Sequence, residues 1–191
     1  LFVAAGFIPG DGQWLRALLE MAQDRHAGAV TGLLEPSEHE ESKPELRADI
    51  TWRRYRRFFL EGARDLNNIY CEQNVLAVPI DLCLVRRELF DLVGGFDEEL
   101  LPRAFFDLDF CLKLRQQGYH NAYTPCCRGR LDGQGWADID DAAGARELAA
   151  FRERWRGVLI HGDPYYNPGK ILSEKKISRE QWLTWYAGKE S

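Results

Sequence analysis

The chain has 191 residues, 45% of them hydrophobic, and carries 25 basic against 30 acidic side chains for a formal net charge of −5. This composition can bury a core and excludes a disordered chain, while the acidic balance argues against nucleic acid as a partner. The longest apolar runs, such as Val75–Ile80, are strand-sized and well short of the roughly 18 residues that a membrane helix needs.

The five cysteines are an odd number and have no C-x-x-C spacing, which argues against a zinc ribbon or a disulfide framework. We therefore expect free, mostly buried thiols and a cytoplasmic location. These cysteines are Cys71, Cys83, Cys111, Cys126 and Cys127.

The first third of the chain predicts a strand, a helix and a second strand. Leu1–Ala5 is apolar, 9–12 is a turn cluster, and a helix is expected from Trp14 with a stop at Gly28 before a strand over Ala29–Leu34. This alternation is typical of an α/β protein with a mostly parallel sheet. Because the chain opens directly on a strand, we expect part of the fold to lie upstream.

An acidic loop is predicted over Glu35–Asp49, followed by a basic aromatic helix over Trp52–Phe59. This helix either docks on the body with its arginines facing the acidic loop, or presents Arg53–Arg57 to an anionic partner such as a lipid-linked diphosphate or a membrane surface. The residues leave both interpretations open.

The remaining pattern predicts five further helices and strands, one loop and a terminal helix. A strand over Val75–Val85 comes first, followed by a helix over Arg86–Val93 that ends at Gly94-Gly95 and a helix over Ala104–Gln117 that ends at Gly118. A strand over Tyr119–Thr124 then ends at Pro125 and leads into a loop over Arg128–Asp141. A helix over Glu147–Leu159 follows, and a capping box at Ser178 and Gln181 opens the short terminal helix.

Three motifs follow one another in the second half of the chain. Gly94-Gly95-Phe96-Asp97-Glu98 comes first, then Phe106-Asp107-Leu108-Asp109 at a helix start, then Gly118-Tyr119. Taken alone, two aspartates at a helix start are first-turn carboxylates that the helix dipole stabilises.

The combined order of these motifs, with Val85-Arg86-Arg87 before them and Tyr123-Thr124-Pro125 after them, resembles the C-terminal half of glycosyltransferase family 2. Phe151–Trp155 and Asp163–Pro168 also look like the tail of bacterial members that build surface polysaccharides. The resemblance runs from about residue 14 to 168.

This resemblance implies a partial GT-A-like three-layer sandwich around a mostly parallel mixed sheet. Residues 1–168 would form a family 2-like domain that lacks its N-terminal nucleotide-binding part, and 169–191 a helical tail. The implied reaction is inverting transfer of a sugar from a nucleotide-sugar donor to a glycan or lipid-linked acceptor, in the cytoplasm or at the inner membrane face.

The family's base falls on Asp107, which would take the proton of the acceptor hydroxyl, with Asp109 as its companion acid. Asp109 could instead orient the helix start or the base. The substrate-binding positions implied by the resemblance and its surroundings are Asp81, Asp97, Glu98, Arg128 and Arg130.

The family usually binds Mn²⁺ or Mg²⁺ at the donor diphosphate, but its customary ligands are missing here. Ala4-Ala5-Gly6 occupies the strand end where carboxylates are expected, no histidine follows Pro125 within the next segment, and Phe106 replaces the usual Glu or Asn. We assign no metal ligand. Arg128 and Arg130 could offset diphosphate charge instead, or could be ordinary loop arginines.

Three hypotheses remain open from the residues. The chain is part of a glycosyltransferase whose nucleotide-binding half lies upstream, or a catalytically degenerate module that serves as a scaffold or binds glycans. The third is an interaction domain that uses the Arg53–Phe59 helix.

Overall fold

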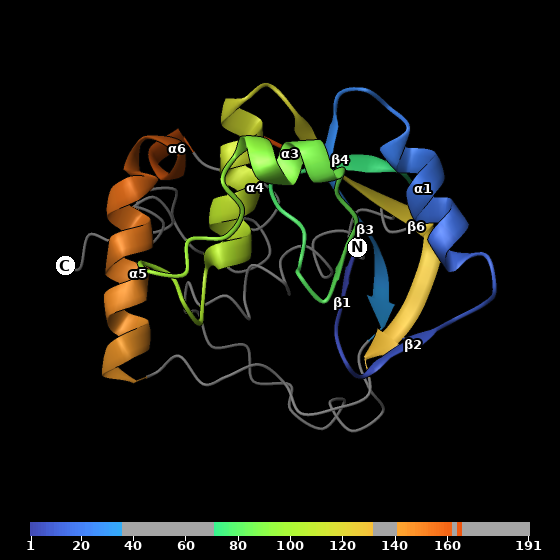
Figure 1. The fold of residues 1–191 in the computed structure, drawn as a ribbon, viewed down its shortest axis with the longest axis horizontal. Helices are drawn as coiled ribbons and strands as arrows, with labels where there is room; N and C mark the ends of the chain where they lie inside the picture. The colour runs from blue at the N-terminus through green and yellow to red at the C-terminus, as the bar shows by residue number, and fades with distance from the viewer. Residues whose placement is uncertain (36–70, 132–140, 162–163, 166–191) are drawn as a thin grey trace, which may run out of the picture.

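The computed structural model describes residues 1–35, 71–131, 141–161 and 164–165. Within these ranges the protein is a mixed α/β structure built on a mixed sheet (Figure 1). Its elements are β1 Phe2–Val3, β2 Phe7–Pro9, α1 Trp14–Ala22, β3 Ala27–Glu35, β4 Gln73–Val75, β5 Leu82–Cys83, α3 Arg87–Leu92, α4 Phe106–Gln116, β6 His120–Leu131, α5 Ala142–Arg154 and α6 Arg156–His161.

Four sequence-based predictions lie outside the described residues. They are the acidic loop beyond Glu35, the basic helix with Arg53–Arg57, the loop over residues 132–140, and the terminal helix with its capping box.

The long strand β6 organises the sheet. It pairs in parallel with β3 on one side, and antiparallel with β4 and β2 along its other side. On the edge of β3 that faces away from β6, the backbones of Val30 and Leu84 exchange hydrogen bonds of 2.8 and 2.9 Å. The β1–β5 pair, also antiparallel, continues from that point.

The expected predominance of parallel pairing is therefore not found among the described strands. Parallel neighbours need a crossover connection, usually a helix. Between β3 and β6 the chain passes through α3 and α4, whereas the other described pairs are antiparallel.

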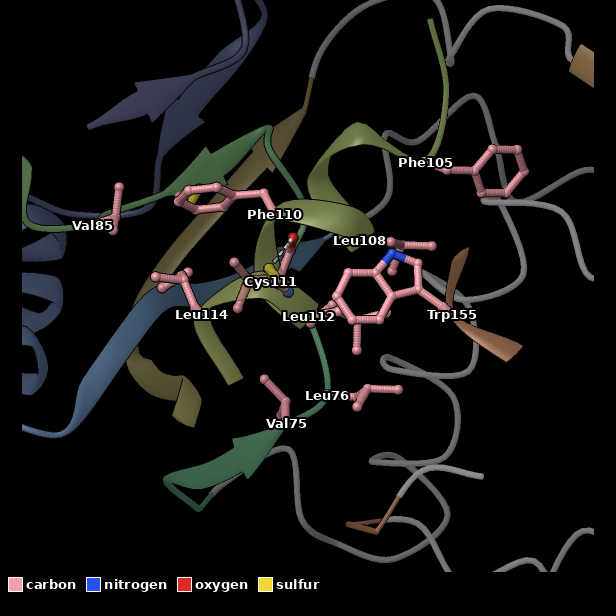
Figure 2. Close-up of a cluster of buried hydrophobic side chains, with 14 of the residues drawn as sticks. Val75, Leu76, Val85, Phe105, Leu108, Phe110, Cys111, Leu112, Leu114 and Trp155 are labelled. Atoms are coloured by element: carbon pink, nitrogen blue, oxygen red, sulfur yellow. Dashed lines mark hydrogen bonds between the residues drawn. The ribbon is translucent and has the colours of Figure 1, made fainter. Parts of the chain in front are cut away.

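Both faces of the sheet are buried. Adjacent residues of β3 point to opposite sides, so Ala29 joins a core with α4 and α5 while Val30 joins a core with Leu18 of α1. The larger core includes Phe110 of α4 and Trp155 (Figure 2). Apolar burial on both faces supplies most of the folding free energy in such a layered fold.

The predicted positions of three helices, α1, α3 and α4, are confirmed. Gly94 and Gly118 follow α3 and α4 with φ of 75° and 86°, a conformation that favours glycine after a helix. The predicted stop at Gly28 is wrong because Gly28 lies inside β3. A Cβ there would approach the Asn121 side-chain oxygen at 3.0 Å, and that oxygen accepts the Ala29 N–H at 3.1 Å.

The predicted continuous strand over Val75–Val85 is wrong. It is divided between β4 and β5, with a mostly buried, non-strand run between them. Pro79 has no N–H to give to a ladder. Side chains from β6 and α4 satisfy this backbone instead, as Asn121 Nδ2 donates to the Leu76 carbonyl at 2.8 Å.

The predicted end of the next strand at Pro125 is also wrong, because β6 continues to Leu131 and takes in the first residues of the predicted loop. Gly32 pairs with Thr124, but the next residue, Leu33, pairs with Arg128. The residues between them form a bulge, which removes Pro125 from the ladder and makes its missing N–H harmless.

The predicted helix over Glu147–Leu159 is two helices. It begins earlier, at Ala142, where the Asp141 side chain accepts the Gly144 N–H at 2.7 Å, and it breaks at Trp155 between α5 and α6. The prediction of free cysteines is confirmed, with three buried and two exposed.

Gly32→Ala is expected to destabilise the protein, because its Cβ would lie 2.4 Å from the Cys127 carbonyl oxygen and 2.6 Å from the Cys127 Cβ in the bulge. We expect a loss of about 1–3 kcal/mol in the free energy of unfolding, measured by urea denaturation. Gly12→Ala is the control, because nothing lies within 4 Å of the added atom. Equal urea midpoints for the two variants would contradict the tight packing of the bulge on β3.

Candidate active site

The candidate site is built at the first turn of α4. The residue before the helix, Phe105, has a left-handed backbone with φ of 63° and is only 2% exposed. Its ring stacks on Phe151 of α5 at 5.3 Å between centroids. A bulky residue in this conformation costs on the order of 1–3 kcal/mol and persists only where its surroundings hold it. The strained residue sits two positions before Asp107.

The Asp107 carboxyl group is buried, with 2% exposure, and lies against the loop before β5. One oxygen accepts the Ile80 N–H at 3.2 Å and the other accepts the Leu108 N–H at 2.9 Å. Burial raises the pKa of Asp107 from 3.8 to about 8; these hydrogen bonds act in the opposite direction, and the charge of Asp81 adds to the rise. The carboxyl group is thus mostly protonated at neutral pH, and its ionised fraction rises as the pH approaches 8.

This result corrects the expectation that the helix dipole keeps Asp107 as an ordinary carboxylate. The dipole effect contributes about 0.3–1 kcal/mol near a helix start, whereas removing a carboxylate from water can cost several times as much. Burial of the first turn therefore decides the protonation of Asp107.

Asp81 follows Ile80 directly, precedes the first residue of β5, and is 6% exposed. Its backbone carbonyl accepts the Ala4 N–H at 2.9 Å, so it joins the end of β1 to the site. Asp81 and Asp107, two of the predicted site residues, are both buried, and the charge of Asp81 acts on the carboxyl group of Asp107.

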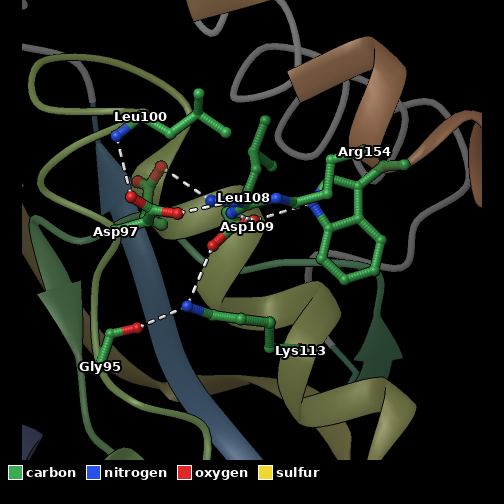
Figure 3. Close-up of polar contacts among 9 residues, drawn as sticks. Gly95, Asp97, Leu100, Leu108, Asp109, Lys113 and Arg154 are labelled. Carbon is green, nitrogen blue, oxygen red and sulfur yellow. Dashed lines mark hydrogen bonds and ion pairs between the residues drawn. The ribbon is translucent and has the colours of Figure 1, made fainter. Parts of the chain in front are cut away.

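Asp109 has a different environment from Asp107. Its side chain is fully buried, and one oxygen accepts hydrogen bonds from Arg154 and from the Trp155 indole N–H, both at 2.9 Å. Its other oxygen lies 3.1 Å from Lys113 Nζ (Figure 3). Asp109 thus has partners from α4 and from the end of α5, two of them cationic, an arrangement that suits a structural role.

Asp97 belongs to the same network. Its carboxylate accepts the Leu100 N–H at 2.8 Å and pairs with Arg154 at 2.7 Å (Figure 3). The Leu100 hydrogen bond and then Arg154 lower the pKa of Asp97. The neighbouring predicted residue, Glu98, has an exposed side chain.

Arg128 and Arg130 lie at the distal end of β6. Arg128 is exposed and its Nε donates to the Pro125 carbonyl at 3.2 Å, while Arg130 is half-buried between Ile8 of β2 and Glu35 of β3 in the sheet register. Strand β3 lies between β6 and the segment of β5, which meets β3 through the bridge of Val30 with Leu84. The two arginines are thus on β6, and β3 lies between them and the segment of β5 that follows Asp81.

Sequence reasoning missed three contributors to the site. They are the Ile80 backbone N–H, the buried carboxylate of Glu147, and Arg154. The helical spacing of Glu147, Phe151 and Trp155 was a usable signal, but periodicity alone does not show that a charged residue on such a stripe is buried.

The divalent cation implied by the resemblance finds no site in the described ranges. No group of three or more His, Cys, Asp or Glu side chains there could hold a metal ion. Ala4, Ala5 and Gly6 follow β1 without a carboxylate, and the Asp11 carboxylate accepts the Gln13 N–H at 2.7 Å. In the same ranges, every helix falls short of the length and apolarity required to cross a bilayer.

No protein-family model matches the chain. The chain is similar to an uncharacterized protein, y4gI, of Sinorhizobium fredii (strain NBRC 101917 / NGR234), with 35% identity over 117 residues. The match covers 58% of this chain and 13% of the length of that protein.

Asp107→Asn is expected to change the pH dependence of stability. Because the folded pKa of about 8 exceeds the ordinary 3.8, the fold favours the protonated acid. The stabilising contribution is present at low pH and is lost as pH rises from about 4 to 8, with a slope of up to about 1.4 kcal/mol per pH unit.

The neutral asparagine lacks this slope, so the stability of the variant relative to the wild type should increase across that pH range. Urea denaturation at intervals between pH 4 and 9 measures the effect. A parallel pair of stability curves would show that Asp107 ionises normally in the folded protein.

Proposed function

We propose that this chain is the acceptor-side half of a family 2, GT-A-type glycosyltransferase that transfers a sugar from a nucleotide-sugar donor to a glycan or lipid-linked acceptor. The observation that carries the proposal is the environment of Asp107, the residue on which the family's base falls. It is a buried carboxyl group whose pKa is raised to about 8, next to a second buried carboxyl group, Asp81.

A general base is most effective when its pKa lies near the working pH, because it is then both available and strongly basic. A carboxylate with an ordinary pKa near 4 is a weak acceptor for a hydroxyl proton. Asp107, with a pKa of about 8, is a much stronger one. In the proposed reaction, Asp107 removes the proton from the acceptor hydroxyl, whose oxygen attacks the anomeric carbon while the nucleoside diphosphate leaves.

The other predicted residues receive different roles in this proposal. Asp81 tunes Asp107 through its charge, and Asp97 and Asp109 support the first turn of α4. Arg128 and Arg130, two strands away, supply positive charge for the donor diphosphate. Glu98, with its exposed side chain, is available for the acceptor.

A second candidate function is a catalytically degenerate module that binds glycans or serves as a scaffold. It is favoured by the 2% exposure of Asp107, since a base must touch its acceptor, and by Phe106 at the position where the family has Glu or Asn. The lack of a carboxylate directly after β1 points the same way.

The decisive experiment measures sugar transfer by the full-length gene product with a panel of nucleotide sugars and with glycan and lipid-linked acceptors. We expect kcat/KM to rise about tenfold per pH unit up to about pH 8, where Asp107 becomes deprotonated. Asp107→Asn should lower kcat by about 10²–10⁴-fold.

Asp91→Asn is the matched control, because this exposed carboxylate lies on α3 in a surface pair with Arg87. Running the panel with Mn²⁺, with Mg²⁺ and with EDTA tests the cation dependence that the resemblance implies. Glycan binding without transfer or donor hydrolysis at any pH would favour the degenerate module.

A further inference from the structure

One face of α5 lies along the segment that carries the candidate base. Glu147, Phe151, Arg154 and Trp155 are spaced at i, i+4, i+7 and i+8, which places them on one stripe of the helix and its end. Each contacts the chain between Arg103 and Asp109, and α5 lies beside α4 (Figure 1).

The first contact precedes Asp107. Glu147, 5% exposed, accepts the backbone N–H groups of Arg103 at 3.1 Å and Ala104 at 2.8 Å through one carboxylate oxygen. A buried carboxylate needs such donors, because burial without them would be costly. The contact therefore holds the backbone directly before the left-handed turn at Phe105.

The second contact is the stack between Phe105 and Phe151, both of which are buried. A left-handed conformation in an aromatic residue is unfavourable by itself and has to be imposed by its surroundings. Here the stack, together with the hydrogen bonds that Glu147 accepts from the two preceding residues, supplies that restraint.

The third contact follows Asp107. The Arg154 guanidinium and the Trp155 indole hold Asp109, and Arg154 also reaches Asp97 at 2.7 Å (Figure 3). A guanidinium can bridge two carboxylates in this way because its donors lie in a fixed plane, which a lysine ammonium cannot reproduce.

We propose that α5 is the positioning element of the candidate site, and that Glu147 and Arg154 are positioning residues that hold Asp107 from both sides. Their anchors fall three residues before Asp107, at Ala104, and two residues after it, at Asp109. The hydrogen bonds of the Asp107 carboxyl group go to Ile80 and Leu108, so α5 acts on it through the backbone. The inference rests on the proposed function only in naming Asp107 as a base.

The test uses the full-length protein with Arg154→Lys and Glu147→Gln. The first keeps a positive charge beside Asp109 but cannot bridge as a guanidinium does, and the second keeps the side-chain shape. Arg146→Lys and Glu153→Gln are matched controls, because both residues are exposed on α5. The measurements are the pKa of Asp107 by ¹³C carboxyl NMR, the melting temperature, and the pH profile of sugar transfer.

If α5 positions Asp107, the pKa of Asp107 in both variants falls from about 8 toward its ordinary value of about 4, because the loosened turn admits water. The same variants should lose about 10- to 100-fold in kcat with little change in the donor KM, since small displacements of a reacting group are costly. The control variants should resemble the wild type in both measurements.

A lower melting temperature with the pKa of Asp107 unchanged would overturn the inference and leave α5 with a purely structural role. A shifted pKa in a protein without transferase activity would support the positioning role and reject the proposed function. Transfer that needs Asp107 but is insensitive to both α5 variants would reject the positioning role alone.

Discussion

The buried carboxylate of Asp109 is the interaction on which the arrangement around α4 depends. A charge without water must be compensated by nearby donors, and removing one partner of such a group is strongly destabilising. Lys113, within α4, forms an ion pair with one carboxylate oxygen, while Arg154 and Trp155 at the end of α5 donate hydrogen bonds to the other. Both cations also bind residues outside α4 and α5: Lys113 donates to the Gly95 carbonyl at 2.7 Å, and Arg154 donates to Asp97. One buried charge thus joins α5, α4 and the turn after α3.

Two aspartates on one helical turn consequently have opposite environments. Asp109 is surrounded by donors, two of them cationic, whereas Asp107 is buried with backbone N–H groups as its hydrogen-bond donors and has a pKa of about 8. Environments that separate two acids in this way are typical of sites where one acid reacts and the other organises. This separation links the fold to the proposed chemistry: the first acid is a candidate base, and the second maintains the turn on which it stands.

The elements that the sequence predicted correctly are those defined by local signals. Apolar residues at helical spacing and the glycines at 94 and 118 located α1, α3 and α4, since a left-handed residue after a helix is a local requirement. Predictions failed where distant residues intervene. Pro125 appeared to end a strand, but β3 pairs with β6 on both sides of a bulge that contains it. The apolar run after β4 resembled a strand, but side chains from elsewhere in the chain bind its backbone.

For the candidate site, the sequence by itself determined the order of the motifs and the presence of two acids at the start of α4. Spacing and residue type are local properties, and they suffice to indicate where a carboxylate base would stand. Only the tertiary structure decided which acid is ion-paired and which is desolvated, because both depend on segments far away in the sequence. Ile80, Glu147 and Arg154 lie 27, 43 and 45 residues from the groups they bind. Electrostatics acts through space, so the chemical difference between Asp107 and Asp109 appears only when these segments are brought together.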